Sequence, residues 1–382
     1  MQTDSLRFAL EADVTISRRT KDILTRSDLG DCLRKLAKNF SSQYWEVIIT
    51  TRRSLLFGGL GVLTAAAVGT RTKTFADPAL QPVKVVIPQE SVFVLNYMGA
   101  KDAGIFAKHG IDLKVDARPF AGFLAGLPSK QCFAVTYSGI DAIEKINEGL
   151  DWAILGPGLT VVQDVIVRKD SPYKTPADLR GKKFGVFSTG AGSFKCARAA
   201  MIDAFKIDVT KDSDLQQVAG PALTKLLESG QLDAMINISS LNLAAEAQPD
   251  KFRVLFSPND YWKRQTGYPI AWAAPLVAWR SWVNEDQTRA KNFAAAVEDS
   301  FRWLEKPENL ETAVKNHGAL AAVTKPEDVA EYKTWLQSKD MFMTDWSRKA
   351  IDAEWKFLGV CQKTGVISKV PDQAKYALFA ES

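Results

Sequence analysis

The sequence predicts an α/β protein with helices appended at its C-terminal end, and three observations lead to this prediction. Between residues 83 and 279, short β-branched runs alternate with segments whose apolar residues repeat at helical spacing. Beyond residue 284 the helical periodicity continues alone. Hydrophobic residues make up 46% of the chain and charged residues 24%, a balance typical of a globular protein.

The first strand–helix–strand unit sets the pattern. Val83–Ile87 is a β-branched run and predicts a strand, and Val92–His109 carries apolar residues at near-helical spacing. Gly110 suits the position just after a helix, because a left-handed backbone costs glycine little. Ile111–Val115 alternates apolar and polar residues and predicts a second strand. Such a unit predicts parallel strands.

The same alternation predicts the remaining elements. Strands are expected at Cys132–Thr136, Trp152–Leu155, Val161–Val167, Lys183–Phe187, Asp233–Ile236 and Ile270–Trp279. Helices are expected at Gly139–Glu148, Phe194–Phe205 and Leu223–Ser229. In the C-terminal region, Asn284 with Gln287 and Thr324 with Glu327 have the spacing of helix-capping pairs.

The N-terminal region has the pattern of an export signal. Arg52 and Arg53 precede an uncharged apolar run, Leu55–Val68, which is too short to span roughly 30 Å of hydrocarbon comfortably. A small-x-small sequence ends at Ala76 and suits cleavage there. Residues 51–76 therefore resemble a twin-arginine signal peptide, which predicts a periplasmic protein. We assign no fold and no function to residues 1–50.

The charge balance of the remaining chain gives no reason to expect a nucleic-acid partner. The net charge is +5, but residues 1–76 hold 12 of the 49 Lys/Arg and 7 of the 44 Asp/Glu, which leaves 37 of each. A nucleic-acid binder usually concentrates basic residues on one surface. After the leader come Cys132, Cys196 and Cys361, which form no CxxC pair and are expected as buried free thiols.

Residue patterns that would indicate catalysis, a metal site or a cofactor are missing from the sequence. The chain has two histidines, His109 and His317, and neither has a second metal-ligating residue at the usual spacing. No GxSxG or HExxH motif occurs. We therefore expect a protein that is not an enzyme and that carries no cofactor and no metal.

Several segments, taken in order, resemble one family of transport proteins. They are Ala107–Leu113, Val165–Pro172, Pro176–Val186 and Leu227–Ala234. Together they are similar to the solute-binding proteins of nitrate, sulfonate and taurine uptake systems, the NMT1/THI5-like group, which also includes binders of the thiamine pyrimidine precursor. The resemblance extends from about Val83 to about Leu304.

This resemblance implies a type II periplasmic-binding-protein fold, in which two α/β lobes are joined by two crossing strands and solute binds between the lobes. Lobe 1 would comprise residues 83–168 and 272–382, and lobe 2 residues 169–271. The crossings would lie near Val165–Lys169 and Pro269–Ala273. The implied partners are a small-molecule solute and the membrane permease of an ABC transporter, and the protein is expected to be a monomer.

Solutes of open α/β sheets bind beyond the carboxyl ends of the strands, which selects several loops. The loop that follows the Lys183–Phe187 strand carries Ser188, Thr189, Gly190, Gly192 and Ser193. Its glycines allow close approach, and the helix that follows offers unpaired N–H groups to a sulfonate, carboxylate or similar anion. The alternative is an ordinary capped turn.

Three other loops occupy equivalent positions. Gln89 and Ser91 follow the first strand, Tyr137 and Ser138 follow the third, and Asn237 follows the Asp233–Ile236 strand. Ordinary turn capping would explain each of them equally well.

Other functions remain open at this point. They are an exported enzyme with a bound nucleotide-type cofactor, a binder of a pyrimidine-type thiamine precursor, and a signalling receptor on the same fold.

Overall fold

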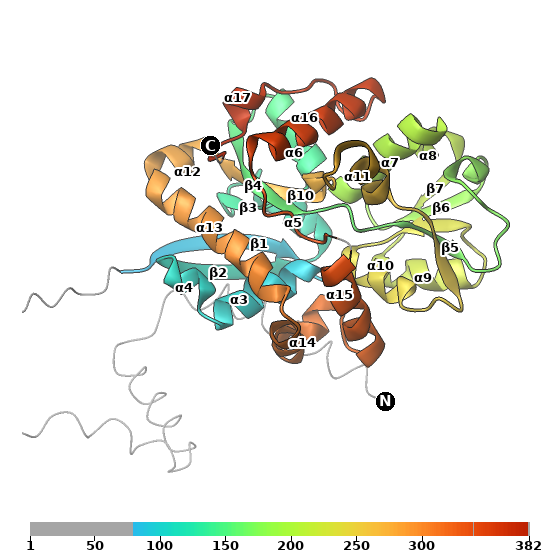
Figure 1. Ribbon diagram of the computed structural model, residues 1–382, viewed down its shortest axis with the longest axis horizontal. Coiled ribbons are helices and arrows are strands. Elements are labelled where there is room, and N and C mark those ends of the chain that lie inside the picture. Colours follow the sequence, from blue (N-terminus) through green and yellow to red (C-terminus); the bar gives the residue numbers. More distant parts are fainter. Residues whose placement is uncertain (1–78, 339, 381–382) are drawn as a thin grey trace, which may run out of the picture. The chain divides into compact units, whose positions relative to one another are not determined.

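The computed structural model describes residues 79–338 and 340–380, so the predicted twin-arginine signal and residues 1–50 lie outside the described residues (Figure 1). The strands are β1 (Gln81–Pro88), β2 (Ile111–Arg118), β3 (Ala134–Thr136), β4 (Trp152–Leu159), β5 (Val165–Arg168), β6 (Lys183–Val186), β7 (Asp214–Gln217), β8 (Ala234–Ile236), β9 (Phe252–Phe256) and β10 (Ala274–Trp279). Among these same residues, none of the helices combines the length and the apolar character that a membrane crossing needs.

Helices lie between the strands and dominate after β10. The helical segments are η1 (Val94–Met98), α3 (Gly99–Asp102), α4 (Ile105–Lys108), α5 (Phe120–Gly126), α6 (Gly139–Asn147), η2 (Pro176–Leu179), α7 (Gly192–Phe205), α8 (Val209–Asp212), α9 (Gly220–Glu228), α10 (Ser239–Glu246), α11 (Pro258–Thr266), η3 (Ala271–Ala273), α12 (Arg280–Glu285), α13 (Gln287–Leu304), α14 (Pro307–Ala321), α15 (Pro326–Ser338), α16 (Arg348–Lys363) and α17 (Gln373–Tyr376).

Strands β1–β4 and β10 form the first lobe. Strand β1 pairs in parallel with β2, and β10 lies between β3 and β4 and is antiparallel to both. Strand β1 also packs beside β3, which brings the two sheets together. Helix α13 covers this lobe by packing against α4 and η1 (Figure 1). A large apolar cluster fills the space between these elements.

Strands β5–β9 form the second lobe, drawn in green and yellow in Figure 1. They make a sheet of five strands in the order β7-β6-β8-β5-β9. Strand β6 is parallel to β7 and β8, whereas β5 is antiparallel to β8 and β9. Separate apolar clusters form around α7 and around α9 with α10. In each lobe, the strand that directly follows a crossing is the antiparallel one.

Two chain segments connect the lobes and hydrogen-bond to each other. The first runs from the end of β4 to the start of β5, and the second from α11 through η3 to β10. They meet where the Val161 N–H donates to the Ile270 carbonyl at 2.9 Å. We expected the first crossing at Val165–Lys169, but Val165–Arg168 form β5 within the second sheet. The expected strand Val161–Val167 is therefore shorter than its apolar run, because its first half is the crossing itself.

The helix expected over Val92–His109 is also interrupted. Residues Val94–Met98 form a π-helical turn, and Gly104 adopts a left-handed φ of 74° between α3 and α4. Apolar spacing alone did not reveal this break, because Ser91–Tyr97 are all buried and show no one-sided helical pattern. Gly110 does take the left-handed position that was predicted, with a φ of 74°.

The C-terminal helices contact both lobes. Helix α14 packs on η1 of the first lobe, and α15 packs on α10 of the second. The buried Tyr332 hydroxyl of α15 lies 2.6 Å from the Ser240 hydroxyl of α10. In α16, the buried Glu354 accepts from the Ala271 N–H of the second crossing, with both carboxylate oxygens at 3.1 Å. These helices therefore link the lobes and one crossing.

Candidate functional site

A small cavity of about 30 Å³ lies between the two lobes. Its walls come from both lobes and both crossings. The lining residues are Pro88, Phe120, Phe123, Ser138, Leu159, Gln163, Phe187, Ala191, Gly192, Ser193, Ile238, Ala273 and Ala274. The volume is enough for one or two water molecules. We call this space the inner cavity.

The N-termini of two helices meet at the inner cavity, one from each lobe. Ser138 precedes α6 and Ser193 lies in the first turn of α7, and both are buried. The Ser138 hydroxyl donates to the Gly190 carbonyl at 3.1 Å, which joins the two N-termini directly. Within the described residues, the N–H groups of Ile140 and Ser193 meet no acceptor. These groups and the helix dipoles favour an acceptor or an anion.

Glycine is required where the two helices approach the second crossing. A side chain at Gly192 would collide with the carbonyls of Trp272 and Ala273. A side chain at Gly139, the first residue of α6, would collide with the same Trp272 carbonyl. Both helices therefore begin in contact with the crossing backbone. The glycine predicted for solute approach at position 192 serves the packing of the two lobes around this crossing.

Gln163, on the first crossing, adds a polar group to the inner cavity. It is 4% exposed, and its Oε1 atom has no hydrogen-bond partner among the described residues. A buried amide oxygen without a partner costs free energy, about 1–3 kcal/mol. The unfilled position indicates that a water or a solute group completes the site.

A second space, the outer chamber, adjoins the inner cavity and measures about 380 Å³. It is lined by Gln89, Glu90, Pro119, Phe120, Phe187, Ala219, Gly220, Pro221 and Ile238. Phe120, Phe187 and Ile238 border both spaces. The rings of Phe120 and Phe187 meet edge to face across the lobes, with centroids 5.0 Å apart at 80°. This aromatic pair separates the outer chamber from the inner cavity.

Some of the predicted site residues do meet at these spaces. Ser138, Gly192 and Ser193 line the inner cavity, and Gln89 lines the outer chamber. Gly190 lies beside them, because its carbonyl accepts from Ser138. The loop after β6 and the loop after β3 therefore lie against each other.

The other predicted residues line neither space, because local hydrogen bonds hold their side chains. The Ser91 hydroxyl donates to the Pro88 carbonyl at 2.8 Å, and Ser188 accepts from the Gly190 N–H at 3.2 Å. Thr189 is exposed, and its hydroxyl donates to the Gln217 side chain at 3.0 Å.

Tyr137 and Asn237 are core residues. The Tyr137 hydroxyl lies 2.8 Å from both the Leu124 carbonyl and the Asp141 carboxylate, which compete for its single hydrogen, and burial raises the pKa of this hydroxyl. The Asn237 side chain donates to the Gly220 carbonyl and accepts from the Ile238 N–H, each at 2.9 Å. Both side chains are buried and bonded within the core, and neither lines the inner cavity or the outer chamber.

Sequence reasoning missed Phe120, Phe187 and Gln163. Phe187 directly follows β6, and Phe120 follows the Arg118–Pro119 end of β2, so both stand at carboxyl ends of strands. Their position at strand ends could have indicated a solute site, although a phenylalanine at such a position is equally typical of the hydrophobic core. Gln163 was hidden inside an apolar run that we expected to be a strand. Trp152, Trp262 and Trp272 are buried in the core and line neither space.

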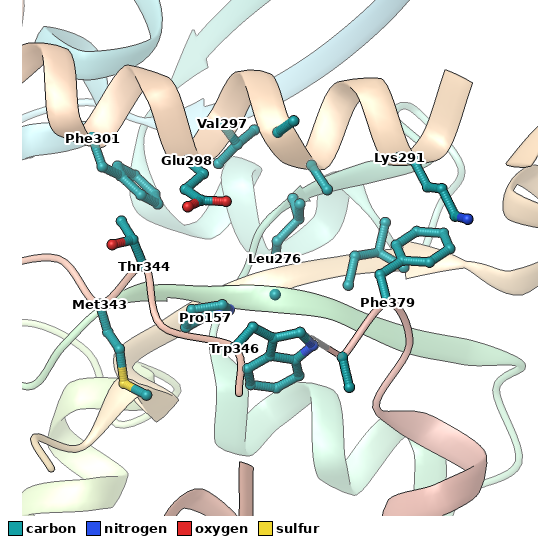
Figure 2. A pocket seen from close by; sticks show the side chains of 15 residues that line it. Pro157, Leu276, Lys291, Val297, Glu298, Phe301, Met343, Thr344, Trp346 and Phe379 are labelled. Carbon is teal, nitrogen blue, oxygen red and sulfur yellow. The ribbon is translucent and has the colours of Figure 1, made fainter. Parts of the chain in front are cut away.

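A third cavity lies in the first lobe, away from the two spaces between the lobes. Figure 2 shows this space of about 370 Å³ between α13, strands β4 and β10, and the chain around Trp346 and Phe379. Lys291 and Phe379 stand together at one end, and Glu298 projects toward Thr344 at the other. It receives residues from one lobe and the C-terminal region only, so lobe closure would not form it.

Metal-binding clusters are missing from the described residues, where no three His, Cys, Asp or Glu side chains converge. His109 and His317 each pair with a surface aspartate, Asp299 and Asp102, at 2.8 Å. Cys132, Cys196 and Cys361 are buried free thiols, as predicted.

The strand order, with one antiparallel strand after each crossing, is that of type II periplasmic binding proteins, as predicted. The NMT1/THI5-like family model matches residues 93–310, which is more than half of the chain. The chain therefore belongs to the NMT1/THI5-like family. A sequence search of the curated proteins finds no match.

Solved structures share the fold at low sequence identity. The periplasmic aliphatic sulphonate binding protein SsuA from Escherichia coli is 17% identical, with a TM-score of 0.60 over 79% of this chain and 93% of that one. The ligand-binding component of an ABC-type import system from Staphylococcus aureus, solved with zinc bound, is 11% identical, with a TM-score of 0.57 over 78% and 96%. The desulfurization enzyme DSZB is 13% identical, with a TM-score of 0.51 over 78% and 96%.

Proposed function

We propose that this protein is the periplasmic solute-binding component of an ABC uptake system, exported through its twin-arginine leader and acting with a membrane permease. The observation that carries the proposal is the cleft between the lobes, where Ser138, Ser193 and Gln163 converge on the inner cavity. Family membership and the likeness to solute-binding proteins support it. Lobe closure around the solute would be the signal that the permease reads.

We further propose that one end of the solute is an acid group, such as a sulfonate or carboxylate. The free N–H groups of Ile140 and Ser193 and the two helix dipoles would hold it without a formal cation. The inner cavity of about 30 Å³ is too small for such a group. Binding therefore requires the lobes to separate by a small hinge motion, and Phe120 and Phe187 to part.

The first experiment is a thermal-shift screen of sulfonates, nitrate, aromatic carboxylates and pyrimidines on the purified protein, since a solute that binds only the folded chain raises its melting temperature. Hits are then measured by calorimetry. Small-angle scattering with and without the best hit tests lobe closure. A library that yields no binder of any class, or scattering curves that coincide at saturation, would count against the proposal.

A pair of variants tests whether the solute identified in the screen binds in the cleft. Gln163→Leu removes a buried amide whose oxygen has no partner in the protein, and the solute should lose roughly ten-fold in affinity. Gln231→Leu removes an exposed amide on the surface turn after α9 and should leave the affinity unchanged. Both melting temperatures are measured without solute, so that a folding defect is recognised. Equal affinities for the two variants would place the solute elsewhere.

Two alternatives are tested alongside. A pyrimidine-type thiamine precursor is included because the family model carries the THI5 name, and it would appear as a hit in the same screen. An exported enzyme with a nucleotide-type cofactor predicts a chromophore, which absorbance and mass spectrometry of the purified protein detect. Because a desulfurization enzyme shares the fold, each hit is also incubated with the protein and examined for a product.

A further inference from the structure

Glu90 is the only ionisable residue among the described residues that line the inner cavity and the outer chamber. The inner cavity is lined by apolar, hydroxyl and amide side chains alone. The outer chamber adds Gln89 and Glu90 to apolar walls formed by Pro119, Phe120 and neighbouring residues. Neither space receives a lysine or an arginine from the described chain.

The Glu90 carboxylate makes no hydrogen bond and no ion pair with the described residues. Nearby carboxylates behave differently, since Asp116 at the end of β2 pairs with Lys84 at 3.3 Å and with Arg118 at 2.6 Å. Arg118 also bonds the Gln131 side chain, so its guanidinium is engaged away from Glu90. Glu90 is partly buried and thus holds an uncompensated negative charge at the chamber wall.

The backbone of Glu90 is held in an unfavourable conformation. Its φ is 55°, in the left-handed region that glycine tolerates and a glutamate does not favour. The Glu90 N–H donates to the Leu320 carbonyl of α14 at 3.0 Å, which fixes the turn. This conformation carries the side chain just beyond the carboxyl end of β1, where solutes of such sheets bind. Strained backbone of this kind is concentrated at functional sites.

We infer that Glu90 contacts the solute and selects one with a cationic or N–H-donating nitrogen on a flat, apolar body. The body would lie in the outer chamber against Phe120, Phe187 and Pro221, and the nitrogen would donate to the Glu90 carboxylate. A charge-assisted hydrogen bond in a partly buried site is stronger than a neutral one. A solute that places a second negative charge in the chamber would instead be repelled. The inference rests on the proposed solute site and narrows its substrate class.

The test uses two probes that differ only at the relevant group, 4-(aminomethyl)benzenesulfonate and 4-methylbenzenesulfonate. Calorimetry gives the affinity of each for the purified protein. We expect the ammonium probe to bind roughly ten-fold more tightly. Glu90→Gln keeps the shape and the backbone strain but removes the charge, and it should reduce this preference to about two-fold or less.

The matched control is Glu327→Gln, which removes the same charge from an exposed position in the first turn of α15. It lines neither space, so the ten-fold preference should persist. Higher salt should weaken the preference in the native protein and in this control, with little effect in Glu90→Gln. That pattern separates a local contact from a change in net charge.

The inference is overturned if the native protein prefers the methyl probe, or if Glu90→Gln keeps the full preference for the ammonium probe. It is also overturned if the tightest cleft ligand of the solute screen carries no donating nitrogen, in which case the proposed function stands. A screen without any ligand contradicts the proposed function itself, so the two failures are distinguishable.

Discussion

Replacing Glu354 with glutamine should remove a pH dependence of stability that originates at the second crossing. Glu354 is 1% exposed, and its carboxylate has the Ala271 N–H as its hydrogen-bond donor. Because this single donor does not replace the lost water, burial raises the pKa of Glu354 from its usual 4.5 to about 8. Its own backbone carbonyl also accepts from the Trp272 indole at 2.9 Å. Its charge state therefore acts directly on residues of the crossing.

The direction of this pH dependence of stability follows from proton linkage. Between about pH 4.5 and pH 8 the folded protein keeps a proton on Glu354 that the unfolded chain has lost. The native state is then favoured at low pH, and this contribution disappears as pH rises toward the folded pKa. For one proton the slope is up to about 1.4 kcal/mol per pH unit. Between pH 5.5 and 7.5 the loss attributable to Glu354 should approach about 3 kcal/mol.

Glutamine matches the shape of glutamate, can still accept from the Ala271 N–H and does not titrate. The free energy of unfolding is measured by urea titration with tryptophan fluorescence at pH 5.5, 6.5, 7.5 and 8.5. The difference between Glu354→Gln and the native protein should grow with pH in favour of the variant. Glu327→Gln, an exposed change of the same kind, supplies the control. Parallel curves for Glu354→Gln and the native protein over this range would refute the reasoning.

Two further predictions concern packing. Gly192→Ala should destabilise the fold by roughly 1–3 kcal/mol, because the added methyl would collide with the Ala273 carbonyl. Gly359→Ala, in open space on α16, should be neutral or stabilise the fold by up to about 1 kcal/mol. Thermal melts of the two variants check both expectations. Tyr332→Phe should cost roughly 1–2 kcal/mol by removing the buried hydrogen bond to Ser240, and an unchanged urea midpoint would show that this contact between α15 and the second lobe contributes nothing.

Periodicity in the sequence was enough to predict the α/β class and most strand positions. The residue after a helix was predicted correctly at Gly110, which takes a left-handed φ. Periodicity failed where an apolar run served two purposes, as at Val161–Val167, which is part crossing and part strand. It also failed at Val94–Met98, where Val94–Tyr97 are all buried and no one-sided apolar period marks the π-helical turn.

The candidate site was predictable in position and less so in composition. Strand ends indicated loops that line the two spaces, and Ser138 and Ser193 do meet at the inner cavity. The sequence does not show whether a hydroxyl or amide is already satisfied by its own backbone, which is why Ser91 and Asn237 were included. Phe120 was overlooked for the opposite reason, since an aromatic side chain at a solute wall resembles one in the core.

The contact of α15 with α10 has a kinetic consequence. Helix α14 is packed on the first lobe and α15 on the second. Separation of the lobes therefore requires either that α15 detaches from α10 or that α15 moves with the second lobe and away from α14. The open state would then be a scarce species, and solute capture would be limited by how often it forms. We expect association rates well below the diffusion limit that fall further in variants tightening this contact. Under the proposed function, bound solute would exchange slowly and stay bound until the two lobes separate.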